Sequence, residues 1–281
     1  MRADRAFQAV ARRCVERFSR HLPELRQSWD AEALHQARVG LRQLLAAFSL
    51  FRPMIGGPGF APLRDRVKAV ARILGEARNL DIMLEAARRH DLPALRGTVS
   101  VMRSQSYAGL MRRLDDAGNR HLAGDLLEWI EHGSWRSRHK ALRHQSLRAF
   151  AGRRLERKWR DLAQRGKTLK SLAAQPRHKV RIAAKKLRYA LEFMAPLAQG
   201  RAARGRRDRL IGTLEEMQDA LGTLNDMRAE ARIAPRVARK GRAAAFAAGR
   251  FMGAEETRAP ALLRRAAKAG RALRRRKPFW R

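Results

Sequence analysis

The segment LHQARVGLRQ (residues 34–43) carries one histidine and two arginines, His35, Arg38 and Arg42, at spacings of three and four. At 3.6 residues per turn, these three side chains share one face of an α-helix. Apolar residues recur on the opposite face, at Ala37, Leu41, Leu44, Phe48 and Phe51. The segment therefore predicts an amphipathic helix that is buried on one side and presents a cationic strip on the other.

A second segment, RHKVRIAAKK (177–186), repeats this arrangement later in the chain. Shifting the sequence by 143 residues pairs the members of the two strips: His35 with His178, Arg38 with Arg181, and Arg42 with Lys185. LGEARNLD (74–81) likewise resembles LGTLNDMR (221–228) at an offset of 147. The repetition predicts an internal duplication, with chance similarity between helices as the alternative.

The helical period of 3.6 dominates the rest of the chain, and the alternation typical of β-strands is nearly absent. Asp30 is expected to cap the helix that follows it, and Pro53 to end that helix. The pattern restarts after residues 133–135. We therefore predict an all-α protein with one helical bundle at residues 1–140 and a second at 141–281.

The charge of the chain is strongly positive: 63 Lys and Arg residues against 26 Asp and Glu give a formal net charge of +37. Self-repulsion on this scale favours a polyanionic partner, with a general bias toward Arg and Ala as the alternative. No apolar run reaches the length of about 18 residues that spans a membrane, and the N-terminus is not a secretory signal. The single cysteine, Cys14, lies on an apolar stripe and is expected in the core. We expect a cytoplasmic protein that does not bind membranes.

The second strip is expected to bind anions more strongly than the first, because it is denser in cations. A solvated face normally mixes charges of both signs, whereas no acid is expected to offset these strips. Pro176 suits the first position of its helix, which would place Arg177, His178 and Lys179 in the first turn, where they oppose the helix dipole. The free N–H groups of that turn also favour anions. A solvated charged face is the alternative. The predicted anion-binding residues are His35, Arg38, Arg42, His178, Lys179, Arg181, Lys185, Lys186 and Arg188.

The two histidines, His35 and His178, are expected to donate hydrogen bonds to phosphate oxygens and to gain charge when the anion binds. A purely structural role at the edge of the strip is the alternative. Neighbouring cations would repel a metal ion, and no nucleophile or carboxylate lies at helical spacing. We therefore expect no metal, no cofactor and no catalytic residue.

These motifs resemble the paired signatures of the CHAD family, the conserved histidine α-helical domain. HQARVGLRQL and HKVRIAAKKLRYALEF carry the resemblance, and LGEARNLD, MQDALGTLND and the terminal KPFW (277–280) support it. The resemblance implies two four-helix bundles related by pseudo-twofold symmetry. The chain departs from the family pattern at Gln43, Leu45 and Asn79, which again suggests that the first strip is the weaker one.

The resemblance also implies binding of inorganic polyphosphate through a basic surface. We expect this binding to occur without catalysis, and the protein to associate with polyphosphate granules. If symmetry brings the two strips face to face, they would line one cleft. A nucleic-acid-binding protein that uses the same positive field is one alternative. A phosphate-transfer or hydrolytic enzyme that uses His35 and His178 is the other.

Overall fold

The computed structural model describes residues 1–280, and helices account for most of them. The α-helices are α1 (Ala3–Arg20), α2 (Leu22–Ser28), α3 (Ala31–Ile55), α4 (Phe60–Arg89), α5 (Pro93–Asp115), α6 (Ala117–Arg120), α7 (Leu122–His132), α8 (Lys140–His144), α9 (Leu147–Arg165), α10 (Ala174–Phe193), α11 (Gly200–Ala238) and α12 (Arg242–Arg275). Within residues 1–280 the only β-type pairing is one isolated bridge between Arg2 and Ser146. The predicted all-α class is confirmed.

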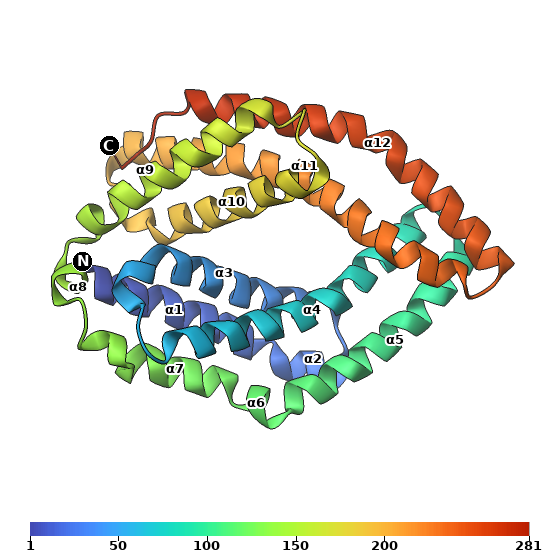
Figure 1. The fold of residues 1–281 in the computed structure, drawn as a ribbon, viewed down its shortest axis with the longest axis horizontal. Coiled ribbons are helices and arrows are strands. Elements are labelled where there is room, and N and C mark those ends of the chain that lie inside the picture. The colour runs from blue at the N-terminus through green and yellow to red at the C-terminus, as the bar shows by residue number, and fades with distance from the viewer. Residues whose placement is uncertain (281) are drawn as a thin grey trace.

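Helices α3 and α10 pack against each other at the centre of the molecule (Figure 1). Helices α1, α2, α4, α5 and α7 lie on the α3 side, and α9, α11 and α12 lie on the α10 side. The two sides are joined at one edge by the segment that contains α8. At the opposite edge, the tip formed by α4 and α5 meets the tip formed by α11 and α12. The two cationic strips therefore belong to the two central helices.

The ends of α3 follow from its sequence with one exception. Asp30 caps the helix as expected, because its Oδ1 accepts a hydrogen bond from the Ala33 N–H at 2.6 Å. The prediction that Pro53 ends the helix is wrong, since α3 continues to Ile55. Proline costs a helix one backbone hydrogen bond, and burial of Met54 and Ile55 at this end offsets that loss.

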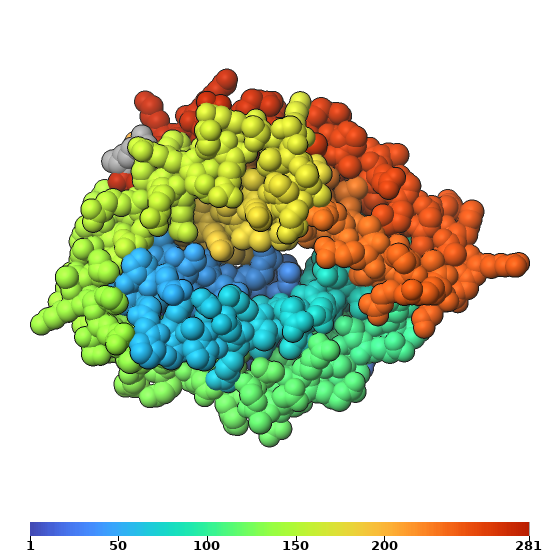
Figure 2. Space-filling view, in the orientation of Figure 1, coloured from blue at the N-terminus to red at the C-terminus, as the bar shows by residue number. Residues whose placement is uncertain are grey.

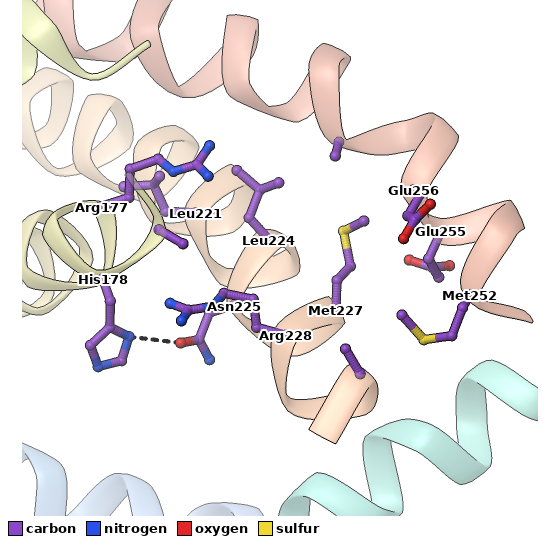
Figure 3. A pocket seen from close by; sticks show the side chains of 13 residues that line it. Arg177, His178, Leu221, Leu224, Asn225, Met227, Arg228, Met252, Glu255 and Glu256 are labelled. Carbon is purple, nitrogen blue, oxygen red and sulfur yellow. Dashed lines mark hydrogen bonds between the residues drawn. The ribbon is translucent and has the colours of Figure 1, made fainter. Parts of the chain in front are cut away.

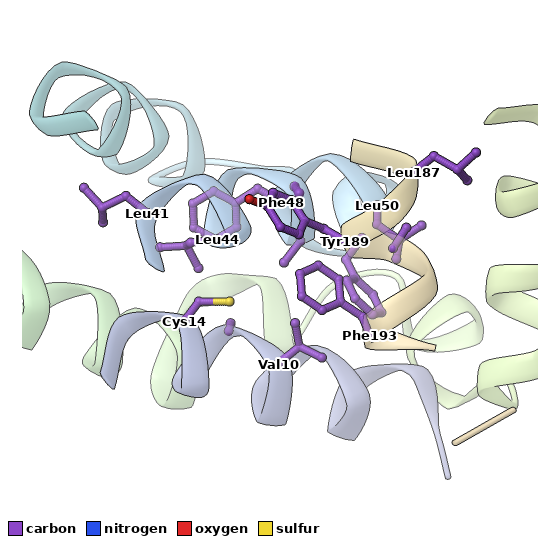
Figure 4. Close-up of a cluster of buried hydrophobic side chains, with 14 of the residues drawn as sticks. Val10, Cys14, Leu41, Leu44, Phe48, Leu50, Leu187, Tyr189 and Phe193 are labelled. Atoms are coloured by element: carbon purple, nitrogen blue, oxygen red, sulfur yellow. The ribbon is translucent and has the colours of Figure 1, made fainter. Parts of the chain in front are cut away.

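The core around α3 positions the strip by holding its opposite face against α1. A Cβ on Gly40 would lie 2.7 Å from the Phe18 nitrogen and 2.8 Å from the Cys14 oxygen, so only glycine allows this close approach. Cys14 is buried as expected, and burial raises the pKa of its thiol to about 12. Figure 4 shows apolar side chains of α1, α3 and α10 meeting in this region.

The buried apolar residues form two clusters, and each draws on both halves of the sequence. The larger one joins α1, α3, α4, α9, α10, α11 and α12 and includes Phe279 and Trp280 of the terminal KPFW motif. Trp280 Nε1 donates a hydrogen bond of 3.1 Å to Glu156 Oε2. The smaller one, which we name the distal cluster, lies where residues 80–102 meet residues 233–251. The division at residue 140 and the internal duplication both stay predictions.

Candidate functional site

The two cationic strips meet in one cleft between α3 and α10, which we name the basic cleft. Its volume is about 220 Å³. Six of the nine predicted anion-binding residues line it, from segments far apart in the sequence: Arg38, Arg42, His178, Arg181, Lys185 and Lys186. The remaining lining residues are Leu45, Ala46, Ile182 and Tyr189. The described lining of this cleft therefore contains no acidic residue.

A second cavity, of about 770 Å³, lies between α3, α10 and α11. It shares Arg42, Lys185 and Tyr189 with the basic cleft, and His35 and Arg188 line it as well. Because it also contains four carboxylates, we name it the acid-rimmed cavity; these belong to Glu192, Glu215, Asp219 and Asp226. Figure 2 shows an opening in the surface between α3 and α4 on one side and α10 and α11 on the other.

The cations of the basic cleft are partly withdrawn from water and repel one another. Burial, followed by repulsion from Arg42 and Arg181, lowers the pKa of Arg38 to about 10. Burial and the same kind of repulsion lower the pKa of Lys185 to about 6. The pKa of Arg181 is also lowered, by burial first and by Arg42 second. Burial and repulsion therefore favour the neutral form of Lys185, and a bound anion would favour its protonation.

Two arginines in the cleft have donors without acceptors. The Nε atoms of Arg38 and Arg181 are buried and make no hydrogen bond within residues 1–280. Buried polar groups are nearly always paired, since an unpaired one costs about 1–3 kcal/mol. Arg38 belongs to α3 and Arg181 to α10, and both residues line the basic cleft. An anion in the cleft would supply the missing acceptors.

The histidines differ in their surroundings. His178 Nδ1 lies 2.7 Å from Asn225 Oδ1, and with that oxygen as acceptor Nδ1 carries the proton and leaves Nε2 free. In contrast, the buried Nδ1 of His35 has no partner in the described chain. Burial is the main cause that lowers the pKa of each ring, followed by Arg78 at His35, whereas the Asn225 hydrogen bond opposes the shift at His178. His35 lines the acid-rimmed cavity, and His178 lines the basic cleft.

The expectation that no acid offsets the second strip is wrong at Arg188. Its guanidinium pairs with Glu192 one turn further along α10 and lies 3.7 Å from Glu215 of α11. Its Nε also donates to Gln218 Oε1 at 3.2 Å. Glu192 lies four residues after Arg188, so the sequence alone could have indicated this pair. The fold brings Glu215 of α11 to Arg188, and helical spacing could not have indicated that contact. Arg188 is thus already neutralised and has few donors left for a ligand.

The N-terminus of α10 also differs from the prediction. The helix begins at Ala174, so Pro176 occupies its third position and Arg177 and His178 lie beyond the first turn. The expected anion site at the free N–H groups is therefore not where the cations lie. Lys179 is exposed and lines neither cavity.

Several residues near the cations were not among the predicted site residues. Asn225 and Asp226 of α11 lie beside His178, Arg181 and Lys185, and Asp226 partly offsets the positive potential at the two cations. Arg78 of α4 acts on His35. All three lie in the repeated motifs 74–81 and 221–228. The repetition singled out these segments in the sequence but did not indicate which residues they contact.

The structure also allows a search for metal sites and for membrane-spanning helices. Within residues 1–280, no group of three or more His, Cys, Asp and Glu side chains could hold a metal ion. Over the same residues, no helix is long and apolar enough to cross a membrane. His90 follows the end of α4, and its Nε2 lies 3.0 Å from Glu255 Oε1 of α12.

The fold and the cleft define an all-helical domain whose two central helices enclose a set of repelling cations. The family model of the CHAD domain matches residues 9–235, and the chain belongs to this family. The crystal structure of the CHAD domain from the plant Ricinus communis is similar over 98% of this chain and 92% of that one, with 25% identity and a TM-score of 0.83.

A second solved structure, PptA from Streptomyces chartreusis, shares the fold. It is 16% identical, covers 96% of this chain and 99% of its own, and has a TM-score of 0.65. A comparison with curated proteins returned no match.

Proposed function

We propose that the protein binds inorganic polyphosphate in the basic cleft, without chemical turnover. The observation that carries the proposal is that Arg38 and Arg181, which line one cleft from two helices, each have a buried Nε donor without a partner in the described chain. Membership in the CHAD family supports the same conclusion.

The chemistry of the ligand fits the cleft. Polyphosphate is a flexible chain of negative charges without bases, so its recognition needs spaced cations and no stacking surface. Arg38, Arg42 and Arg181 can each donate two hydrogen bonds to phosphate oxygens, and Lys185 adds a compact charge. Binding releases counterions, and the affinity should fall steeply with salt.

The alternative of a nucleic-acid-binding protein is less well supported by the lining of the cleft. Among the described lining residues, Tyr189 is the only Phe, Tyr or Trp, and it is 4% exposed. A buried ring offers no face on which an unpaired base could stack. The cleft therefore contains groups for a phosphate chain and lacks an exposed aromatic ring on which a base could stack.

The alternative of a phosphate-processing enzyme requires His35 and His178 to act on one phosphate. The two histidines line different cavities. Incubating the protein with long polyphosphate and Mg²⁺ or Mn²⁺ tests this point. Chain shortening that either histidine substitution abolishes would contradict the non-enzymatic proposal.

The central experiment is a competition between polyphosphate, duplex DNA and RNA, compared at equal phosphate concentration and about 150 mM salt. We expect polyphosphate to displace both nucleic acids, and Arg181→Ala to weaken its binding. Arg236→Ala removes an exposed cation from the far end of α11 and is the matched control. Equal or stronger binding of nucleic acid, or equal losses in the two variants, would overturn the proposal.

The proposed location is the cytoplasm, in association with polyphosphate granules. The support is indirect: a protein with a net charge of +37 and a phosphate-binding cleft would be drawn to dense polyphosphate. Imaging of a fluorescent fusion in cells with and without polyphosphate synthesis tests this proposal. A distribution that does not depend on the polymer would contradict it.

A further inference from the structure

A third cavity adjoins the basic cleft but has a different character. It lies between the start of α10, the middle of α11 and α12, and its volume is about 260 Å³. Its apolar lining includes Leu221, Leu224, Met227 and Met252. His178 lines both this cavity, which we name the methionine pocket, and the basic cleft. Polyphosphate has no apolar part, so binding of the polymer does not account for this pocket.

The charged side chains of the methionine pocket are separated by sign. Figure 3 shows Arg177, His178 and Arg228 on one side and the carboxylates of Glu255 and Glu256 on the other, with Leu224 and Met227 between them. The pocket therefore suits a ligand that has an anionic end, an apolar middle and a hydrogen-bond donor at its other end.

Three of these charged side chains are available to a ligand. Within the described residues, Arg177, Arg228 and Glu256 make no side-chain hydrogen bond or ion pair, whereas Glu255 is engaged by His90 and by Arg258 at 2.6 Å. Glu256 is exposed at the edge of the pocket. An ionised carboxylate only accepts hydrogen bonds, so it selects a ligand edge that carries donors.

A purine base matches the apolar part of the pocket. Methionine thioethers contact flat aromatic rings favourably, and the two methionines come from different helices, Met227 from α11 and Met252 from α12. A hydrocarbon chain would also fit the apolar lining, but it has no donor that could replace water at the exposed carboxylate of Glu256. Guanine presents two neighbouring donors, N1–H and the 2-amino group. Adenine instead places the acceptor N1 beside its amino group, where a carboxylate repels it.

We infer that the methionine pocket binds the base of a guanosine polyphosphate, whose phosphates extend past Arg177 and Arg228 to His178 at the basic cleft. Glu256 accepts the hydrogen bonds of the guanine edge. The inference rests on the proposed function for the phosphate end of the ligand only, because the base end depends on residues outside the basic cleft.

The test compares the affinities of GTP, ATP and inorganic tripolyphosphate, measured by calorimetry at one salt concentration. We expect GTP to bind about tenfold more tightly than tripolyphosphate, since the phosphates are alike and the nucleoside adds the pocket contacts. Glu256→Gln should weaken GTP about fivefold and leave tripolyphosphate unchanged. Glu216→Gln, an exposed residue of α11 outside the pocket, makes the same change of charge and is the control.

A second variant fills the pocket from its solvent side. Ala231 lines the pocket and is exposed, so Ala231→Phe should be tolerated by the fold while it blocks the base. We expect this variant to lose the advantage of GTP over tripolyphosphate and to keep its affinity for long polyphosphate.

The outcomes separate the two proposals. Equal affinity for GTP and tripolyphosphate would overturn the inference and leave polyphosphate binding intact. Tight GTP binding without polyphosphate binding would overturn the proposed function and leave the inference about the methionine pocket intact. A preference for ATP, or displacement of GTP by an eight-carbon alkyl phosphate, would also overturn the assignment of guanine.

Discussion

His178 Nδ1 lies 2.7 Å from Asn225 Oδ1, so a hydrogen bond joins the cationic strip of α10 to α11. The bond fixes the tautomer of the ring and leaves Nε2 for a ligand. It also opposes the loss of basicity that burial causes at this histidine. The same contact connects the two motifs that the sequence repeats, since His178 lies in one and Asn225 in the other.

The first prediction concerns this contact. Asn225→Ala removes the acceptor that favours the charged ring, and we expect the pKa of His178 to fall below its already lowered value. An NMR titration of the His178 ring protons measures the change. Asn79→Ala in the related motif of α4 is the control and should leave the titration as it is. An unchanged pKa in Asn225→Ala would show that the hydrogen bond has no effect on the charge of the ring.

The second prediction is a stability gain from removing Lys185. Its pKa in the folded state, about 6, lies below the ordinary value of 10.5, so the unfolded state binds the proton more tightly. The resulting penalty is full below about pH 6 and disappears as pH rises toward 10.5. Lys185→Met should therefore raise the free energy of unfolding at pH 7 and weaken polyphosphate binding. Denaturation at pH 7 and pH 10 should show a smaller gain at the higher pH; an equal gain would contradict the titration of Lys185.

The third prediction is that polyphosphate binds more tightly as pH falls from 8 to 6. A bound anion raises the pKa of Lys185 above the value of about 6 that it has in the protein without ligand, and binding is then coupled to proton uptake. Affinities measured in buffers of equal ionic strength should show the trend. Lys185→Arg keeps the cation charged throughout this range and should flatten it. A profile that is as steep in the variant would assign the proton to the histidines instead.

The fourth prediction ranks two arginines of the same helix. Arg181 has a buried donor without a partner, whereas Arg188 pairs with Glu192 and Gln218. We expect Arg181→Ala to weaken polyphosphate binding about tenfold or more, since hydrogen bonds to charged groups contribute about 1.5–3 kcal/mol. Arg188→Ala should have a smaller effect. The opposite order in a binding titration would mean that the ligand displaces the carboxylates from Arg188.

Much of the site was predictable because helical spacing places side chains on a face whatever the tertiary structure. Arg38, Arg42, Arg181 and Lys185 needed only that rule and an expected pseudo-symmetry to be assigned to one cleft. The cap at Asp30 followed from equally local chemistry. Local rules failed at the helix ends, where burial of Met54 and Ile55 carries α3 past Pro53.

The environment of each cation was not predictable, because it depends on other helices. Asp226 and Glu215 come from α11 and reach the strips through packing alone. The difference between the histidines has the same origin: the offset of 147 residues puts Arg78 where the second half has Asn225. A cation in place of an amide leaves His35 without the hydrogen bond that His178 makes, and this asymmetry appears only once α4 and α11 are in place.

The distal cluster has a consequence for the affinity of the cleft. Its contacts between residues 80–102 and 233–251, together with the His90–Glu255 pair, hold the two ends of the molecule closed far from Arg38 and Arg181. Mutual repulsion in the cleft pushes the central helices apart, so apolar burial at the periphery opposes that force before any ligand arrives. Packing in the distal cluster therefore contributes to the affinity of the cleft. Conservative changes at remote residues such as Phe251 should alter the affinity for a polyanion, although these residues do not contact the ligand.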